Sequence, residues 1–159
     1  MTGSTDHYEI SALVSRYFRA LDERRFEGRW ARDCLTDDVR LVAPIGTAQG
    51  GQATRLTAQS LEKFARTQHM ATDILIEVEP GARQGSASWN ALMTHVHHDE
   101  TLRRHGPGAS PLLVVGGRYD AELLRTEDGW RIRGLTVQVI WTTGEPPDAP
   151  ADPVGTPER

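Results

Sequence analysis

Apolar residues in the first part of the chain recur at the three- and four-residue spacing of a helix. The clearest case is Asp6–Leu21, whose large apolar side chains fall on one stripe. Asp6 and Glu9 have the spacing of a capping box, so we expect this helix to begin at Asp6. Weaker helical patterns cover Phe26–Leu35 and Thr54–Gln68. The pattern therefore predicts about three helices, most of them ahead of the strands.

The rest of the chain shows runs of β-branched and aromatic residues that favour strands. Strands are predicted at Val39–Ala43, Ile74–Val78 and Ala87–His98, and as a hairpin over Leu112–Trp141 with its turn at Arg125–Gly129. Loops are predicted at Thr36–Asp38, Gly46–Gln52 and Glu100–Ser110. Helices that precede strands indicate an α+β fold. We expect a curved antiparallel sheet wrapped around the helices, a cone whose interior suits a small apolar ligand.

The first arm of the hairpin has one apolar and one charged face. Side chains alternate along a strand, so Tyr119 and Leu123 point one way, whereas Arg118, Asp120 and Glu122 point the other way. The charged face either contacts water or lines a polar pocket. The alternation alone leaves both interpretations open.

Composition and charge narrow the class of protein. The 159 residues suit one domain, which we place at residues 1–143 and follow with a proline-rich tail at 144–159. A net charge of −4 argues against nucleic-acid binding through a general positive field. No apolar run reaches the roughly 20 residues of a membrane span, and the polar N-terminus lacks a signal-peptide core. We expect a soluble, cytoplasmic protein in which the single Cys34 is a small buried apolar residue.

Several short segments carry a family resemblance. Tyr17–Asp22, Trp30 and Leu35–Val39, followed by Gln68–Met70 and Asp128–Ile132, resemble the NTF2-like superfamily and are most similar to its SnoaL-like branch. The resemblance extends from about Glu9 to Trp141. It implies the α+β cone, usually as a homodimer, and a cofactor-independent activity on small molecules.

The resemblance also implies site residues. Asp22, His69, His95 and Asp120 fall at or near the pocket aspartate, the two histidines and the polar hairpin residue of scytalone dehydratase. Asp120 also corresponds to the general acid/base of SnoaL-like polyketide cyclases.

Two further positions bear on the comparison. Tyr17 matches the oxyanion-binding tyrosine of ketosteroid isomerase. Ala43 stands where that isomerase has its base and where scytalone dehydratase has one of its tyrosines. The chain therefore lacks part of the machinery of both enzymes.

Each candidate also has a structural interpretation. An imidazole at His69 can accept and donate a proton near neutral pH, but it can equally bond to backbone at a helix end. Asp22 can orient that imidazole, or it can belong to a solvated charge run at a helix terminus. Asp120 can pair with Arg118 in a pocket, or both can belong to an exposed ladder of charges. His95 can transfer protons or mark a wet strand end.

A cavity wall is predicted from Tyr17, Trp30, Trp89 and Met93, although the first two also suit a plain core. His95 and His97 form a His-x-His pair, which can bind zinc or iron. Metals are exceptional in this superfamily, and we expect none. Nucleotide-loop, hydrolase-elbow and paired-cysteine motifs are missing from the sequence.

The sequence therefore supports a cofactor-independent enzyme that cyclises, dehydrates or isomerises a hydrophobic, oxygenated small molecule such as a polyketide. The alternative is a non-catalytic binding module or a partner resembling an oxygenase small subunit. The enzyme hypothesis predicts that His69, Asp22 and Asp120 converge in one enclosed pocket.

Overall fold

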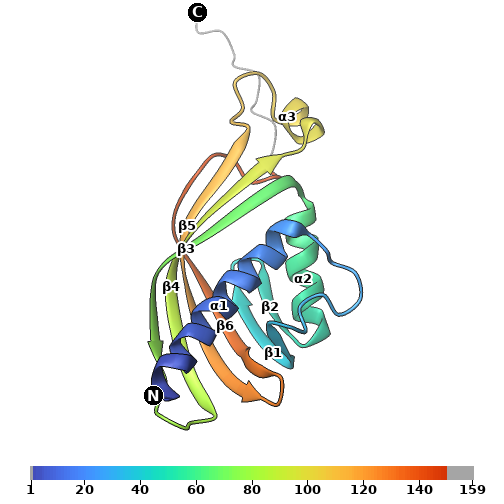
Figure 1. Cartoon of the computed structure of the whole chain (residues 1–159). Helices are drawn as coiled ribbons and strands as arrows, with labels where there is room; N and C mark the ends of the chain where they lie inside the picture. The colour runs from blue at the N-terminus through green and yellow to red at the C-terminus, as the bar shows by residue number, and fades with distance from the viewer. Residues whose placement is uncertain (1, 150–159) are drawn as a thin grey trace, which may run out of the picture.

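A computed structural model describes residues 2–149 as a curved sheet with its two longer helices on the concave side (Figure 1). The elements, in chain order, are α1 Thr2–Glu23, β1 Leu35–Ala43, β2 Gly46–Gln49, α2 Gly51–Glu62, β3 Phe64–Glu77, β4 Gln84–His97, α3 Asp99–His105, β5 Leu112–Thr126 and β6 Gly129–Thr143. The predicted α+β class is confirmed. Of the predicted tail, residues 150–159 lie outside the described residues.

The sheet has six strands in the order β2-β1-β6-β5-β4-β3. Every neighbouring pair is antiparallel except β1 and β6, which run parallel with Leu41 opposite Leu135. The prediction of a purely antiparallel sheet is therefore wrong at one pair. The hairpin is confirmed, and its last pair, Thr126 with Gly129, leaves a two-residue loop. Gly129 has φ 103°, a conformation that glycine adopts without a Cβ clash.

The core lies between α1 and the concave face of the sheet. The apolar stripe of α1 is almost completely buried and comprises Ile10, Leu13, Val14, Tyr17, Phe18 and Leu21. Along β5, Tyr119 and Leu123 are buried, whereas Arg118, Asp120 and Glu122 are exposed. The predicted alternation is confirmed, and the charged face of the hairpin is the convex, outer face of the sheet.

The predicted start of the first helix is wrong. The helix α1 begins at Thr2, so Asp6 lies inside the helix and does not cap it. Its buried carboxylate accepts hydrogen bonds from Trp130 Nε1 at 3.2 Å and from the Arg125 guanidinium. This carboxylate joins α1 to the hairpin of β5 and β6, a contact that local spacing does not reveal.

The predicted helix over Phe26–Leu35 is also wrong, because turns occupy this segment as far as β1. Arg24 and Gly28 both have φ 58°, a left-handed conformation that interrupts helical hydrogen bonding. The strand β1 begins at Leu35, so it includes Thr36–Asp38, which were predicted as a loop.

The second long helix ends earlier than predicted. The helix α2 stops at Glu62, and β3 begins at Phe64 and pairs with β4 as far as Glu77. Pairing along β4 outweighs the helical spacing of Phe64–Gln68. As a result, His69 lies within a strand, opposite Met93.

Two predicted loops contain regular structure. Gly46–Gln52 holds β2 and the first residues of α2, and Glu100–Ser110 holds most of the short helix α3. Among the described residues, no helix is long and apolar enough to cross a membrane.

Candidate active site

An inner cavity of about 480 Å³ lies between the helices and the concave face of the sheet. Its wall is mostly apolar and comprises Tyr17, Leu21, Leu41, Ala43, Pro44, Ile45, Thr57, Ser60, Leu61, Lys63, Phe64, Met93, His95, Leu113, Val115, Tyr119, Val137, Val139, Pro146, Pro147 and Asp148. A cavity of this size and polarity suits a small hydrophobic ligand with a few polar groups.

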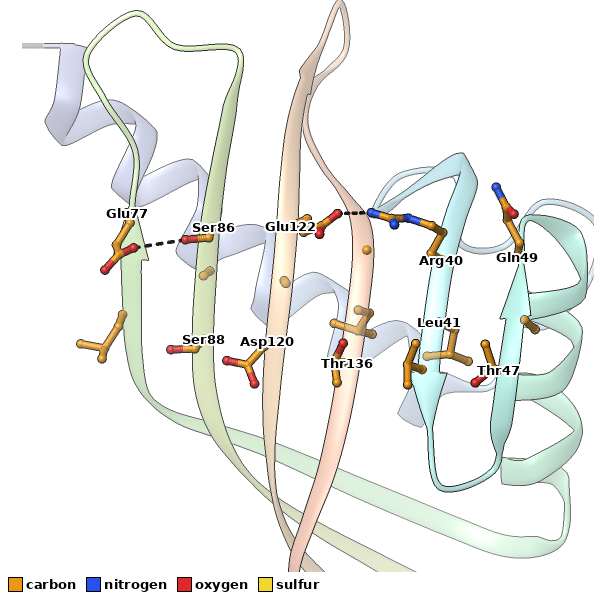
Figure 2. Close-up of a pocket in the computed structure, with 17 residues that line it drawn as sticks. Arg40, Leu41, Thr47, Gln49, Glu77, Ser86, Ser88, Asp120, Glu122 and Thr136 are labelled. Atoms are coloured by element: carbon orange, nitrogen blue, oxygen red, sulfur yellow. Dashed lines mark hydrogen bonds and ion pairs between the residues drawn. The ribbon is translucent and has the colours of Figure 1, made fainter.

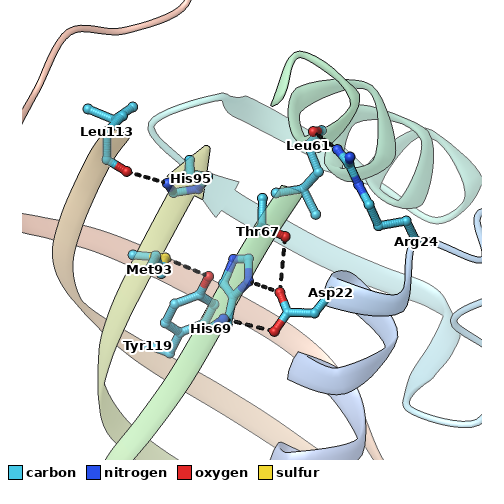
Figure 3. A network of polar contacts seen from close by, with 9 residues as sticks. All are labelled: Asp22, Arg24, Leu61, Thr67, His69, Met93, His95, Leu113 and Tyr119. Atoms are coloured by element: carbon cyan, nitrogen blue, oxygen red, sulfur yellow. Dashed lines mark hydrogen bonds and ion pairs between the residues drawn. The ribbon is translucent and has the colours of Figure 1, made fainter. Parts of the chain in front are cut away.

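Asp22 and His69 form a tight pair beside this cavity (Figure 3). His69 Nδ1 lies 2.6 Å from Asp22 Oδ1, and the His69 backbone N–H donates to Asp22 Oδ2 at 2.9 Å. Thr67 Oγ1 donates to Oδ1 at 3.0 Å. Both carboxylate oxygens therefore have partners, which fixes the carboxylate against the imidazole ring.

The position of Asp22 follows from the end of α1. Just beyond it, Arg24 turns back and donates hydrogen bonds to the carbonyls of Leu61 and of Ala65, the latter at 2.8 Å. These bonds tie the end of α1 to α2 and β3. The charge run at this helix terminus is therefore only partly solvated, and Asp22 faces the strand that carries His69.

The charge state of Asp22 suits the orientation of a histidine. Burial raises the pKa of Asp22, but the hydrogen bonds from His69 and Thr67 outweigh it, so the net pKa lies below the ordinary value. Asp22 is therefore ionised at neutral pH. A carboxylate at Nδ1 favours the tautomer that carries its proton there, which leaves Nε2 with a lone pair.

His95 is a neutral histidine in the cavity wall. Burial and the nearby His69 lower the pKa of His95 to about 4. Its Nδ1 lies 3.1 Å from the carbonyl oxygen of Leu113, so in the neutral ring Nδ1–H donates and Nε2 accepts. The rings of His69 and His95 stand nearly perpendicular, with centroids 5.8 Å apart.

Tyr119 is a cavity residue whose role the sequence did not indicate. Its hydroxyl donates to Met93 Sδ at 3.4 Å, and a thioether is a weak acceptor. Burial raises the pKa of Tyr119, so the phenol keeps its proton. Its ring stacks on Trp89 at 5.3 Å and meets Phe18 edge-on at 5.1 Å. The only indication in the sequence of a cavity role for Tyr119 was its place on the inward strand face that it shares with Ala121 and Leu123.

The pair lies beside the cavity, and neither of its members belongs to the cavity lining. His69 does not line the cavity, and its side chain is only 2% exposed. Figure 3 shows it between Asp22 on one side and the group of Met93, His95 and Tyr119 on the other. Those three side chains line the cavity, so the imidazole lies directly behind its wall.

The predicted wall residues occupy different places. Tyr17 and Met93 line the cavity. Trp89 is 1% exposed and lies behind Tyr119, in the core. Trp30 packs edge-on against Phe26 at 5.1 Å and lines a separate hollow of about 220 Å³. Only two of these four residues therefore contact the cavity.

Asp120 does not converge with Asp22 and His69. It lies on the outer face of the sheet, in a groove of about 710 Å³ that also holds Glu122 in an ion pair with Arg40 (Figure 2). Arg118 is exposed on the same face. The expectation of a three-residue cluster is wrong because the strand alternation that buries Tyr119 turns Asp120 outward.

The remaining chemically active side chains are separate from the pair. Cys34 is buried, and burial raises the pKa of its thiol. His97 Nε2 lies 3.0 Å from the Glu145 carbonyl oxygen. Within residues 2–149 no group of three histidine, cysteine or acidic side chains is arranged to hold a metal ion.

Ala43 and Pro44 lie in the cavity wall. The position at which the resemblance placed an isomerase base therefore faces the ligand space, but it presents only a methyl group.

A family model identifies the class of protein. The chain belongs to the SnoaL-like domain family, whose model matches residues 3–136. A search of curated proteins found no match. The resemblance predicted from the sequence is confirmed.

Solved structures share the fold along most of the chain. A Novosphingobium aromaticivorans protein described as a scytalone dehydratase has a TM-score of 0.75 at 19% identity, covering 99% of this chain and 98% of that one. A type 2 hexachlorocyclohexane dehydrochlorinase, LinA, has a TM-score of 0.73 at 18% identity, and the match covers 98% of each chain. An NTF2-like superfamily protein from Salmonella enterica has a TM-score of 0.69 at 18% identity. The match covers 89% of this chain and 96% of that one. The NTF2-like fold is confirmed.

Proposed function

We propose that this protein is a cofactor-independent enzyme in which His69, held by Asp22, removes a proton from a carbon atom of a hydrophobic small molecule. The 2.6 Å contact between His69 Nδ1 and Asp22 Oδ1, next to an apolar cavity, carries the proposal. An ionised carboxylate stabilises the imidazolium that forms when Nε2 accepts the proton.

The proposed reaction is an elimination. His69 Nε2 takes a proton from the carbon next to a carbonyl or similar group, and the electrons of the C–H bond form a carbon–carbon double bond. The leaving group departs from the adjacent carbon with its bonding electrons. A departing hydroxide takes up the proton that His69 removed, so the net loss is one molecule of water. When chloride leaves, His69 releases that proton to solvent.

Tyr119 is the proposed hydrogen-bond donor to the leaving oxygen. Its phenol lines the cavity and keeps its proton because its pKa is raised. To donate to a ligand, the hydroxyl would lose only its weak hydrogen bond to the Met93 thioether. His95 suits a different role. With Nδ1 directed to a carbonyl and a pKa of about 4, it is a neutral acceptor for a substrate hydroxyl.

Two neighbours favour elimination over cyclisation or isomerisation. Their names, a scytalone dehydratase and a hexachlorocyclohexane dehydrochlorinase, denote the loss of water and of hydrogen chloride. Both reactions begin from a small molecule that can lose a proton and a leaving group from neighbouring carbons. The apolar wall of the cavity suits a hydrophobic skeleton, such as that of a polyketide.

A ketone series tests the proposal. The probes are one phenyl-substituted ketone with hydroxyl, aryloxy or chloride on the carbon β to the carbonyl, and the conjugated enone product is followed by its absorbance. We expect the wild-type protein to accelerate the loss of all three groups, and His69→Ala to lower kcat by about 10²-fold or more.

His98→Ala is the matched control, because His98 is exposed and outside the cavity. Wild-type rates in His69→Ala would contradict the assignment. Tight binding of the ketones without turnover would instead support a ligand-binding module.

A further inference from the structure

The chain beyond β6 turns back over the inner cavity. Residues 144–149, which we call the strap, follow Thr143, and Pro146, Pro147 and Asp148 of the strap line the cavity. The Ala149 N–H donates to the Pro146 carbonyl at 3.0 Å, which makes the far part of the strap a compact turn. The strap therefore forms one wall of the space in which a ligand would lie.

The near end of the strap is held by buried groups. His97, which is 2% exposed, has Nε2 3.0 Å from the carbonyl oxygen of Glu145. His105 is also buried, and its Nδ1 lies 3.2 Å from the Glu145 carboxylate. Opening this end would leave the buried Nε2 of His97 without a partner, which is costly. This end is therefore expected to stay in place.

The far end of the strap is held by exposed groups. Lys63 Nζ lies 2.7 Å from Asp148 Oδ2, and Arg104 Nη2 donates to the Pro147 carbonyl at 2.6 Å. The side chains of Lys63 and Asp148 are 52% and 74% exposed. Water can replace exposed contacts of this kind, so this end opens more easily than the near end, at a modest cost that these contacts set.

We propose that the strap is a hinged, specificity-determining wall of the cavity, anchored at Glu145 and opened at Pro147 and Asp148 to admit ligand. When it is closed, two proline rings complete the apolar wall. Lys63 and Asp148 neutralise each other at the same place, so the closed wall favours a neutral ligand over a charged one. The inference rests on the proposed function only in requiring that an apolar molecule enters the cavity.

Stopped-flow binding of N-phenyl-1-naphthylamine, a neutral probe that fluoresces in apolar surroundings, tests the strap. The loosened protein carries Arg104→Met and Asp148→Asn in the full chain, which removes the hydrogen bond from Arg104 and the ion pair with Lys63. We expect its association and dissociation rate constants to rise together by at least about 5-fold, with the dissociation constant changing less, because the same opening step limits entry and release.

The control carries Arg103→Met and Asp38→Asn, which change the same charges at exposed side chains outside the cavity. Circular dichroism melting confirms that both proteins fold. Equal rate constants in the loosened protein and the control would overturn the inference, and so would failure of the loosened protein to bind the probe. Probe binding needs no catalytic turnover, so failure of the strap is distinguishable from failure of the proposed function, which the ketone series tests.

Discussion

The helix α1 carries a partly or fully buried carboxylate near each end, and the two have different partners. Asp6 is 3% exposed and accepts from Trp130 and from Arg125, whose guanidinium lies 4.7 Å from the centre of the Trp130 ring. Asp22 accepts from Thr67 and from both the backbone and the ring of His69. One contact joins α1 to the hairpin, and the other joins it to β3 beside the cavity.

The partner decides what each carboxylate can do. The pKa of Asp6 is lowered by the hydrogen bonds from Trp130 and Arg125, and that of Asp22 is also lowered, so both are ionised at neutral pH. Arginine keeps its proton at any pH at which the protein folds, whereas an imidazole gains and loses one near neutrality. Asp6 can therefore only hold the fold, while Asp22 can support proton transfer.

Asp22→Asn should separate the two ends most sharply. The amide cannot stabilise an imidazolium, so we expect kcat on the ketone series to fall by about 10²-fold, no further than in His69→Ala, while the melting temperature changes little. The ¹⁵N spectrum of the imidazoles reads the same contact without a substrate, because the Nδ1–H signal of His69 should lose its strong hydrogen-bond shift. An unchanged signal would contradict the assigned pair.

Asp6→Asn should give the opposite result. Loss of the Asp6 charge leaves the partly buried Arg125 guanidinium without a counter-ion. We therefore expect the melting temperature to fall by about 5 °C or more. The remaining folded protein should keep kcat within about twofold, since Asp6 lies outside the cavity. A large loss of kcat at a temperature where the variant is fully folded would show that the two ends are not independent.

Tyr119→Phe should affect only the chemistry. Removal of one donor to a departing oxygen should lower kcat about 10- to 100-fold for the hydroxyl leaving group and scarcely at all for chloride, which needs little proton assistance. Asp120→Asn, the next residue on the opposite face, is the control and should stay within about twofold. An equal loss for every leaving group would assign Tyr119 a purely structural role.

His95 should make the folded protein less stable in acid. Its pKa of about 4 lies below the ordinary 6.5, so as pH falls through this interval the unfolded chain gains a proton that the folded protein does not. The linked loss in free energy of unfolding is about 2 kcal/mol between about pH 8 and pH 5. Urea unfolding of His95→Gln should show a dependence on pH that is weaker by about this amount. An identical dependence would contradict the lowered pKa.

Periodic patterns predicted the parts of the fold that depend on one face being buried. The stripe of α1 and the alternation along β5 were correct because burial of a continuous face specifies them. The end of α2 was wrong because Phe64–Gln68 satisfies helical spacing, yet pairs with β4. That outcome depends on a strand more than twenty residues further along the chain.

The site was predictable only in part. Asp22, His69 and His95 came from the resemblance, and the structure brings them together. Asp120 came from the same comparison but faces the outer groove, because the alternation along β5 places it on the face opposite the buried Tyr119. The contacts of Asp6 with Trp130 and of Tyr119 with Met93 were not predicted, since the partners are distant in sequence.

A double-mutant cycle on the ketone series tests the central claim, that Asp22 and His69 act as one unit. The measured quantity is kcat/KM for the wild type, Asp22→Asn, His69→Ala and the double variant, each shown to be folded. If Asp22 works through His69, the double variant should match His69→Ala within about twofold, because removing one member already disables the pair. Losses that multiply, or a His69→Ala protein as active as the wild type, would contradict the account.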